Sequence, residues 1–489
     1  MDEKHIVAID LGTSKLAVTI ARVSGEDIQV IYYKETPSVG IRYSYVLNPK
    51  QVADTLRPVI ENAERELNMK ITQAVVGMPR YSVRQETNQG SIDHNPDECI
   101  SMDDINYIKS IAQDEYPLGN DKEVLFGAVA QSFSTSEDFQ LIEKDIIGMA
   151  SDKLEGNFKI FIGLKRYLQN IDMVFNQLGI AVAGKYFTPD TTSRAVLTYA
   201  EMESGVALID FGAGVTSVSI HSGNIMRHYA AIPFGGRSIT YDIDNECKIF
   251  SENLAENLKL AYGICMPEKL QNMNDKILRI NIGTTAQYKD LPVKYLSEVI
   301  SSRVQEIMEA ILYEIERSGF ADSLRSGIVL TGGGANLANC KNFITEMSGY
   351  SVRIGYPKPV FSGSGCIGVH EAEAATSIGM ILAAIKDNCP ECAVIEDGNR
   401  PRTSVVIETP AEEIAAENNT QTKEAEQTNT ELFPESEEEK ERRIEEAKKK
   451  AEEKTGKKGP WGGKKITWLK KKLDQFTDSL YDGMKNEEV

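Results

Sequence analysis

Hydrophobic positions follow two rhythms between His5 and Asn388. Short runs rich in apolar and β-branched residues alternate with segments whose apolar residues return every three or four positions. The first rhythm is typical of β-strands and the second of amphipathic helices. Their alternation predicts an α/β fold for this part of the chain.

Two distant segments repeat one layout. "HIVAIDLGTSKLAVTIARV" begins at His5 and "GVALIDFGAGVTSVSIHSG" begins at Gly205, and each holds an apolar strand, an aspartate, a glycine-containing turn and a second strand. Each is predicted to form a β-hairpin, with Asp10 or Asp210 at the head of its turn. Two like hairpins suggest two similar lobes that face each other. A third glycine turn, "IVLTGGGANLAN", follows a strand predicted over residues 327–330 and precedes a helix.

The pattern changes after Asn388. Residues 389–459 are rich in Glu, Lys, Asn, Gln and Thr and nearly free of aromatic residues. Such a composition cannot bury enough apolar surface to offset the entropy of ordering, which predicts a disordered linker. Its second half carries charge pairs at i,i+4 spacing that would support a solvated helix: Glu438 with Arg442, Glu445 with Lys449 and Glu446 with Lys450.

A helical stripe returns near the end of the chain. Apolar side chains recur there at gaps of three and four, lysines flank them, and a tryptophan lies at the margin. This arrangement predicts an amphipathic helix over residues 460–485 that lies in a membrane surface. The membrane-facing residues are predicted to be Trp461, Lys464, Lys465, Ile466, Trp468, Leu469, Lys470, Lys472, Leu473, Phe476 and Leu480. Docking of this helix on the protein's own body or on a partner is the alternative.

Charge divides the chain into an acidic body and a basic end. The net charge of −19 argues against nucleic-acid binding by the body. The end nevertheless holds seven lysines and no acid between Lys457 and Lys472. Because the Debye length is only about 8 Å at cellular salt, this local charge is expected to attract an anionic membrane surface. No apolar stretch is long enough to span a membrane and the start leaves no room for a secretory signal, so we expect a cytoplasmic body.

Seven scattered cysteines, an odd count, favour reduced thiols. Cys389 and Cys392 form a "CPEC" motif that is open to a metal-binding or redox interpretation. A single C-x-x-C motif lacks a second ligand pair at zinc spacing, which favours two unligated thiols.

The glycine turns carry the strongest chemical signal. If they meet, Gly12, Gly212 and Gly214 let backbone N–H groups approach a polyanion. Hydroxyl donors would come from Thr13, Ser14 and Thr216, and Lys15 would offset phosphate charge. Asp10 and Asp210 would then contact a hydrated Mg²⁺ ion through water, since Mg²⁺ keeps most of its waters. Taken singly, a turn of the first type is usually only structural, and the third could be a tight strand–helix junction whose glycines serve packing.

The turns resemble a known superfamily. "AIDLGTSK", "LIDFGAGVTSVSI" and "IVLTGGGANL" are similar to the phosphate-1, phosphate-2 and adenosine motifs of actin, heat-shock chaperones and sugar kinases. More narrowly, "SRAVLTYAEMESGVALIDFG", "PFGGRSITYDI" and "EVISSRVQEIMEAIL" resemble the FtsA family of bacterial actin-like cell-division proteins. The resemblance implies an α/β, actin-like two-lobed ATPase fold with an FtsA-type 1C insert, followed by the linker and the amphipathic helix.

The resemblance also implies a division into subdomains. The expected boundaries are residues 1–85 and 166–200 for 1A, 86–165 for the 1C insert, 201–236 and 320–371 for 2A, 237–319 for 2B, and 372–388 for the closing helix of 1A. Residues 389–459 are the expected linker and 460–485 the expected membrane helix.

ATP and Mg²⁺ are the cofactors that the resemblance implies. It assigns Glu256 and Lys259 to the adenosine and ribose, with an ordinary ion pair on a helix surface as the alternative. Gly332, Gly333 and Gly334 belong to the adenosine motif, and Asp210 would be catalytic if ATP is hydrolysed. Ser193 or Arg194 stands where actin has a water-positioning glutamine, and Ser217 where FtsA proteins commonly have an acid. Slow or undetectable ATP hydrolysis is therefore expected.

The implied function is filament formation at the division site, on the cytoplasmic face of the inner membrane. The FtsZ C-terminal peptide would dock on 2B near Arg303, unless Arg303 is bonded to Glu306 or nearby acids. Later division proteins would bind 1C. A PilM-like adaptor of pilus assembly and a sugar kinase or exopolyphosphatase of the same superfamily remain as alternatives.

Overall fold

The computed structural model describes residues 3–269, 275–281, 288–363 and 365–395. The predicted linker beyond Ile395 and the predicted membrane helix lie outside the described residues, so both stay predictions. Among the helices that are described, none is both long and apolar enough to cross a membrane.

Two five-stranded sheets share one strand order. In the first, the order is β11-β7-β1-β2-β3, and in the second it is β18-β17-β12-β13-β14 when read in the matching direction. Each sheet has three antiparallel strands in sequence, and the first of them pairs in parallel with a later strand. The bounds are β1 (Lys4–Leu11), β2 (Lys15–Ser24), β3 (Asp27–Pro37), β7 (Gln73–Gly77), β11 (Ala181–Tyr186), β12 (Val206–Phe211), β13 (Thr216–Ser222), β14 (Ile225–Ile232), β17 (Ile328–Thr331) and β18 (Val352–Ile354).

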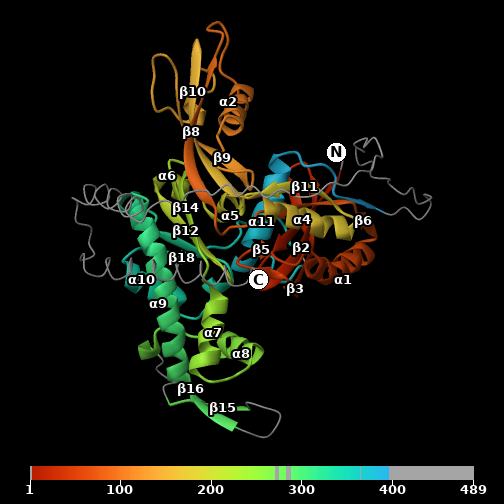
Figure 1. Cartoon of the computed structure of the whole chain (residues 1–489), viewed down its shortest axis with the longest axis vertical. Coiled ribbons are helices and arrows are strands. Elements are labelled where there is room, and N and C mark those ends of the chain that lie inside the picture. Colours follow the sequence, from red (N-terminus) through yellow and green to blue (C-terminus); the bar gives the residue numbers. More distant parts are fainter. Residues whose placement is uncertain (1–2, 270–274, 282–287, 364, 396–489) are drawn as a thin grey trace, which may run out of the picture. The chain divides into compact units, whose positions relative to one another are not determined.

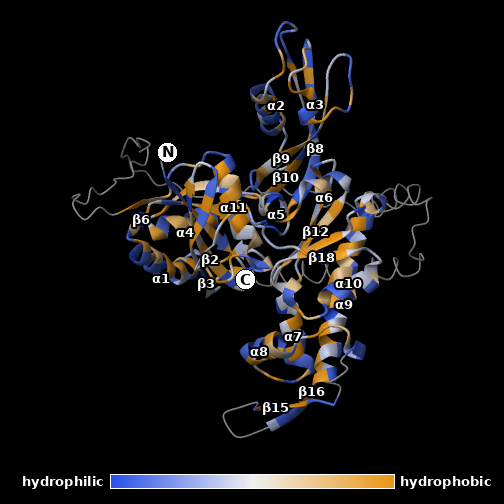
Figure 2. Ribbon diagram, turned by 180° about the vertical axis from the view of Figure 1, so that it is seen from behind, coloured by the Kyte–Doolittle hydropathy of each residue, from blue (hydrophilic) through white to orange (hydrophobic). Residues whose placement is uncertain are grey.

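The two predicted hairpins are confirmed. β1 pairs with β2 from Lys4 opposite Val23 to Leu11 opposite Leu16, and β12 pairs with β13 from Val206 opposite His221. Both first strands are buried along nearly their whole length, which explains why they read as continuous apolar runs. Figure 2 shows β12 and α11 (Ala375–Lys386) as largely hydrophobic.

Helix α1 (Pro49–Leu67) packs on the first sheet, and its sequence explains where it begins, where it ends and which face it buries. The Asn48 side chain accepts a hydrogen bond from the Gln51 N–H at 3.1 Å, and proline stands at the first helical position. The helix ends at Asn68, whose φ of 50° is left-handed. Its buried face includes Val52, Leu56 and Ile60, at the four-residue spacing of an amphipathic helix.

A separate three-stranded antiparallel sheet lies where the resemblance places the 1C insert. Its order is β8-β10-β9, and it packs against α2 around a core that includes Ile108, Phe133 and Phe158. Figure 1 shows this sheet and α2 together. The bounds are β8 (Arg84–Asp93), α2 (Met102–Asp114), β9 (Glu123–Ser134), α3 (Glu143–Ile146) and β10 (Lys153–Leu164).

Helices α7, α8 and α9 gather in the region expected to be 2B. α7 packs against both α8 and α9, and the hairpin of β15 and β16 contacts the start of α9. The bounds are α7 (Gly236–Glu246), α8 (Glu252–Tyr262), β15 (Ile277–Asn281), β16 (Tyr288–Pro292) and α9 (Val293–Arg317). The remaining elements are β4 (Ile41–Arg42), β5 (Tyr45–Val46), β6 (Met69–Ile71), α4 (Lys165–Leu178), α5 (Thr188–Val196), α6 (Tyr199–Ser204), η1 (Pro267–Lys269), η2 (Ala321–Ser323), η3 (Gly333–Asn336), α10 (Cys340–Ser348), η4 (Ala372–Ala374) and β19 (Ala393–Ile395).

The predicted end of the folded region at Asn388 was placed too early. β19 pairs antiparallel with β6, and the Cys392 N–H donates to the His5 carbonyl at 2.8 Å. Cys392 and Ala393 are fully buried. The short apolar run "CAVI" was included in the predicted linker over residues 389–459, because the composition of that segment as a whole is polar. The described fold therefore continues to Ile395.

Candidate functional site

The three glycine turns meet in space. A Cβ atom placed on Gly214 of the second turn would lie 2.7 Å from the Thr13 side chain of the first turn. A Cβ atom on Gly332 of the third turn would lie 2.6 Å from Oδ1 of Asp210. Glycine is therefore required at both positions for the turns to approach one another. Turns from three separate parts of the sequence form one site.

The first and second turns are built alike. A Cβ atom on Gly12 would lie 2.5 Å from the Lys15 carbonyl, and one on Gly212 would lie 2.7 Å from the Val215 carbonyl. The Gly212 N–H donates to that same Val215 oxygen at 3.1 Å. In both hairpins the turn is so tight that only glycine fits at this position. The absence of a side chain there lets an anion approach the backbone amides of the turn.

The hydroxyl groups predicted to donate to phosphate differ in their surroundings. Oγ1 of Thr13 accepts a hydrogen bond from the Ser44 N–H at 3.2 Å, so its own proton stays available for another acceptor. Ser14 is exposed. Thr216 is fully buried, and its hydroxyl donates to the Phe234 carbonyl at 2.8 Å. The structure thus gives Thr216 a role in holding the second turn to the segment after β14, rather than a free hydroxyl.

Asp10 and Asp210 lie at corresponding ends of β1 and β12, and the charge of Arg80 acts on both. The Arg80 guanidinium forms an ion pair with Oδ2 of Asp210, which is 8% exposed. Burial raises the pKa of Asp10, the nearby charges of Arg80 and Lys15 oppose that effect, and Asp210 adds to it. The two aspartates are therefore close enough to act on each other. Sequence reasoning missed Arg80, because a single arginine after β7 belongs to no motif.

Lys15 is not a free cation. Its Nζ donates to Oε2 of Glu373 at 2.7 Å and also pairs with Glu35. Oε1 of Glu373 in turn accepts a hydrogen bond from Asn336, next to the third turn, at 3.4 Å. Lys15 therefore ties the first turn to the third, and any phosphate it contacts would share it with two carboxylates.

Glu256 and Lys259 form a pair that is more than a surface ion pair. Lys259 is only 8% exposed, and its Nζ donates to the Gly236 carbonyl at 2.9 Å, to Thr240 Oγ1 at 2.8 Å and to Glu256 Oε2 at 2.7 Å. Burial lowers the pKa of Lys259, while Glu256 opposes that shift. The pair thus lies against the start of α7.

The start of α7 itself rests on the second turn. The Gly236 N–H donates to the Gly212 carbonyl at 2.9 Å, and the Arg237 N–H donates to the Ala213 carbonyl at 2.8 Å. These bonds place Lys259 beside the glycine turns. Residues predicted separately for phosphate and for adenosine contact are in this way brought to one place.

The donor set at this place fits a magnesium–nucleotide complex. Tight glycine turns present backbone amides that suit phosphate, and two aspartates suit the water shell of a magnesium ion. Within the described residues no cluster of three or more His, Cys, Asp or Glu side chains is arranged to hold a metal ion directly. Contact of the aspartates with Mg²⁺ through water therefore stays a prediction.

Two further predicted sites have partners within the protein. Arg303 on α9 donates to Oδ1 of Asp242 at 2.9 Å and to Oε2 of Glu306 at 2.8 Å. The hydrogen bond to Asp242 raises the pKa of Arg303. This pairing is the intramolecular alternative considered above. Cys389 and Cys392 are buried with their sulfur atoms 4.0 Å apart, and burial raises the pKa of Cys392 to about 12.

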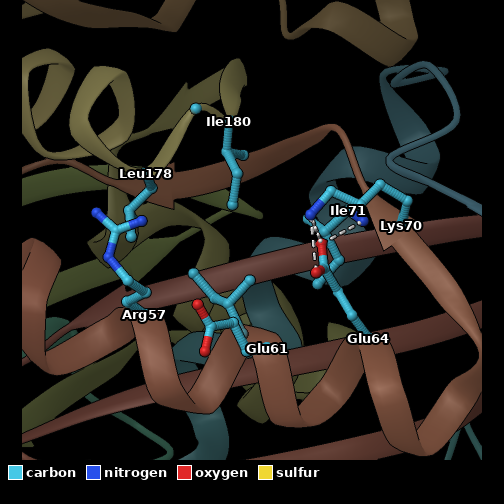
Figure 3. Close-up of a pocket in the computed structure, with 9 residues that line it drawn as sticks. Arg57, Glu61, Glu64, Lys70, Ile71, Leu178 and Ile180 are labelled. Carbon is cyan, nitrogen blue, oxygen red and sulfur yellow. Dashed lines mark hydrogen bonds and ion pairs between the residues drawn. The ribbon is translucent and has the colours of Figure 1, made fainter. Parts of the chain in front are cut away.

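A small cavity of about 70 Å³ lies elsewhere, between α1, β6 and the end of α4 (Figure 3). Three of its charged side chains are partnered: Lys70 Nζ lies 2.8 Å from Glu64, and Arg57 donates to the Gln177 carbonyl at 2.8 Å. None of the predicted site residues lines it.

Comparisons with known proteins agree with this geometry. Residues 207–379 match the family model described as "Cell division protein FtsA". The FtsA protein of Borreliella burgdorferi is 30% identical over 362 residues, which cover 74% of this chain and 86% of the relative. That of Neisseria meningitidis is 29% identical over 388 residues, covering 78% of this chain and 91% of the relative.

One solved structure, described as the PilM–PilN type IV pilus biogenesis complex, superimposes with a TM-score of 0.55 at 13% identity and covers 78% of this chain and 98% of that chain. At this identity the likeness concerns the fold alone. Together with the sequence relatives and the paired sheets, it leads to one conclusion: the chain belongs to the FtsA family of cell-division proteins and has an actin-like fold.

Proposed function

We propose that this chain binds Mg·ATP where its three glycine turns meet, assembles on the inner face of the cell membrane and holds FtsZ there during division. The observation that carries the proposal is the contact of Gly214 with Thr13 and of Gly332 with Asp210. The first contact joins the two five-stranded sheets, and the second brings the third turn to Asp210 within the second sheet, in a chain whose relatives are cell-division proteins.

Each part of the site has a role in this proposal. Backbone amides at Gly12 and Gly214 bind the phosphates, Gly212 closes the second turn through its bond to Val215 and leaves room for them, and Asp10 and Asp210 orient water molecules. A bound magnesium ion supplies charge neutralisation for the phosphates. The Glu256–Lys259 pair and the glycines of the third turn, Gly332, Gly333 and Gly334, contact the adenosine.

Hydrolysis is proposed to be slow. The Ser193 hydroxyl donates to the Asp190 carbonyl at 2.7 Å, and Nε of Arg194 donates to Asp190 Oδ2 at 3.0 Å. Neither group has the carboxamide that positions water in actin. A nucleotide that contacts turns of both sheets and is consumed slowly can stabilise one arrangement of the sheets, and so favour contacts between copies.

FtsZ binding is proposed for residues 237–319, with Arg303 as a contact for an acidic peptide. Because Arg303 already pairs with Asp242 and Glu306, a peptide carboxylate would have to compete with them. Later division proteins are proposed to bind residues 86–165. Membrane attachment is proposed for the helix over residues 460–485, where many copies in one filament gain effective concentration.

Co-sedimentation with anionic liposomes tests the proposal. With ATP, the full chain should carry FtsZ into the liposome pellet, and Leu473→Asp with Phe476→Asp should abolish pelleting of both proteins. Asp478→Asn, on the opposite face of the predicted helix, serves as the matched control.

A second pair of variants separates FtsZ binding from membrane binding. Arg303→Glu should reduce the FtsZ in the pellet at least several-fold and leave the chain itself on the liposomes. Arg317→Glu, at the exposed end of the same helix, should leave both in place. FtsZ recruitment by the chain that is unchanged in Arg303→Glu would contradict the assigned contact. Rapid phosphorylation of a sugar would instead favour the kinase alternative.

A further inference from the structure

The Arg80 guanidinium lies against Asp210, and its charge also acts on Asp10. It forms an ion pair with Asp210, and it is the foremost of the charges that counter the effect of burial on the pKa of Asp10. Burial disfavours the charge of Arg80 itself, but Asp210 and Asp10 outweigh that effect and raise the pKa of Arg80. Arg80 therefore stays charged beside both carboxylates.

The backbone fixes Arg80 in this position from two sides. Its N–H donates to Oγ of Ser44 at 2.9 Å, and Ser44 donates from its own N–H to Thr13 in the first turn. Its carbonyl accepts a hydrogen bond from the Tyr229 hydroxyl of β14 at 2.5 Å. The Arg80 side chain is 17% exposed. Arg80 is thus held by the first turn and by the second sheet, unlike a free arginine on a surface.

The other cations near the turns are already shared with acids. Lys15 is bonded to Glu35 and Glu373, and Lys259 to Glu256. A polyphosphate that enters the site would meet the two aspartates, whose negative charge Arg80 partly offsets. The free energy needed to place phosphates there depends on how far Arg80 neutralises the aspartates, because like charges a few ångströms apart repel strongly in a partly buried site.

We infer that Arg80 is a nucleotide-site residue of this chain, a tethered cation that shares with Mg²⁺ the neutralisation of Asp10 and Asp210. The inference rests on the proposed binding of nucleotide. It makes Arg80 a positioning residue that acts through the aspartates. With Arg80 present, ATP binds with a reduced requirement for Mg²⁺.

A neutral residue in place of Arg80 leaves the two aspartates without their counter-charge. ATP without metal is then repelled more strongly. Mg·ATP would lose less, because a bound Mg²⁺ ion would supply part of the positive charge that Arg80 no longer provides to Asp10 and Asp210. The ratio of the dissociation constants for ATP in EDTA and in excess Mg²⁺ should therefore rise at least tenfold in Arg80→Met and in Arg80→Gln.

Isothermal titration of the full chain with ATP, in EDTA and in excess Mg²⁺, measures this ratio. Arg80→Lys keeps the charge and should keep the ratio near that of the unaltered chain. Arg84→Met is the matched control, since Arg84 pairs with Glu86 and Glu123 on the three-stranded sheet. Thermal unfolding of each variant verifies that it is folded, and Arg80→Gln, which retains hydrogen bonding to Asp210, replaces Arg80→Met if the latter does not fold.

The possible results separate the inference from the function on which it rests. A ratio that is unchanged in the neutral variants, or an equal loss of affinity with and without Mg²⁺, overturns the role of Arg80 and leaves nucleotide binding standing. Failure of the unaltered chain to bind ATP under either condition overturns both.

Discussion

Lys259 and Asp210 are both nearly buried, and each has a partner of opposite charge. Glu256 accepts a bond from Lys259, and Arg80 pairs with Asp210. For the largely buried Arg80–Asp210 pair, removing one partner is expected to cost about 3–5 kcal/mol, because the remaining charge is left uncompensated. At the scale of single residues, the site therefore depends on matched charges as much as on its glycines.

His221 gives a prediction about pH. It is 2% exposed on β13, and burial lowers its pKa from 6.5 to about 4. The unfolded chain therefore takes up a proton near pH 6.5 and the folded chain only near pH 4, so the free energy of unfolding should fall as the pH drops through this window. The loss from this one group is about 3 kcal/mol.

Urea unfolding between pH 7 and pH 4 measures that loss. His221→Gln should flatten the dependence, and the remaining slope should include His228, whose pKa burial also lowers to about 4. A slope that is the same in His221→Gln and in the unaltered chain would contradict the assignment.

At the scale of elements, β19 defines where the fold ends. A chain ending at Asn388 lacks β19 and the buried Cys392 and Ala393, and leaves β6 without a partner. It should be about 2–4 kcal/mol less stable than a chain ending at Ile395, from lost apolar burial and ladder hydrogen bonds. Calorimetric melting compares the two chains. Val394→Ser, at an exposed position of β19, should melt nearly as the unaltered chain does. Equal melting temperatures of the two shortened chains would show that β19 does not contribute to stability.

The elements also show which parts of the structure can be predicted from the sequence. The two hairpins could be predicted because each follows from a local pattern, an apolar run followed by a glycine turn and a second strand. Arg80 and Glu373 could not, since their roles arise from contacts with residues distant in the sequence. β19 was missed for the same reason, because its partner β6 lies more than 300 positions earlier in the chain. The glycine turns were found because their residue types already restrict the backbone to a few conformations.

At the scale of the whole molecule, the candidate site depends on parts of the chain that are distant in the sequence. Two sheets of the same strand order each present a glycine turn and an aspartate, and these turns meet where Gly214 approaches Thr13. The third turn, which follows β17 of the second sheet, lies against Asp210. Neither sheet alone assembles this site. A ligand that contacts both turns would link the sheets, which is what a nucleotide-dependent assembly requires.

Binding of Mg·ATP to the full chain and to Gly214→Ala tests this claim most directly. The added methyl would press on Thr13, whereas in Gly119→Ala, the control, it would lie 3.4 Å from the end of the Glu123 side chain. Titration calorimetry should show that the unaltered chain and Gly119→Ala bind Mg·ATP alike, and that Gly214→Ala binds at least tenfold more weakly while melting within a few degrees of the unaltered chain. Equal affinity of Gly214→Ala, or no binding of Mg·ATP by the unaltered chain, would contradict the placement of a nucleotide where the turns meet.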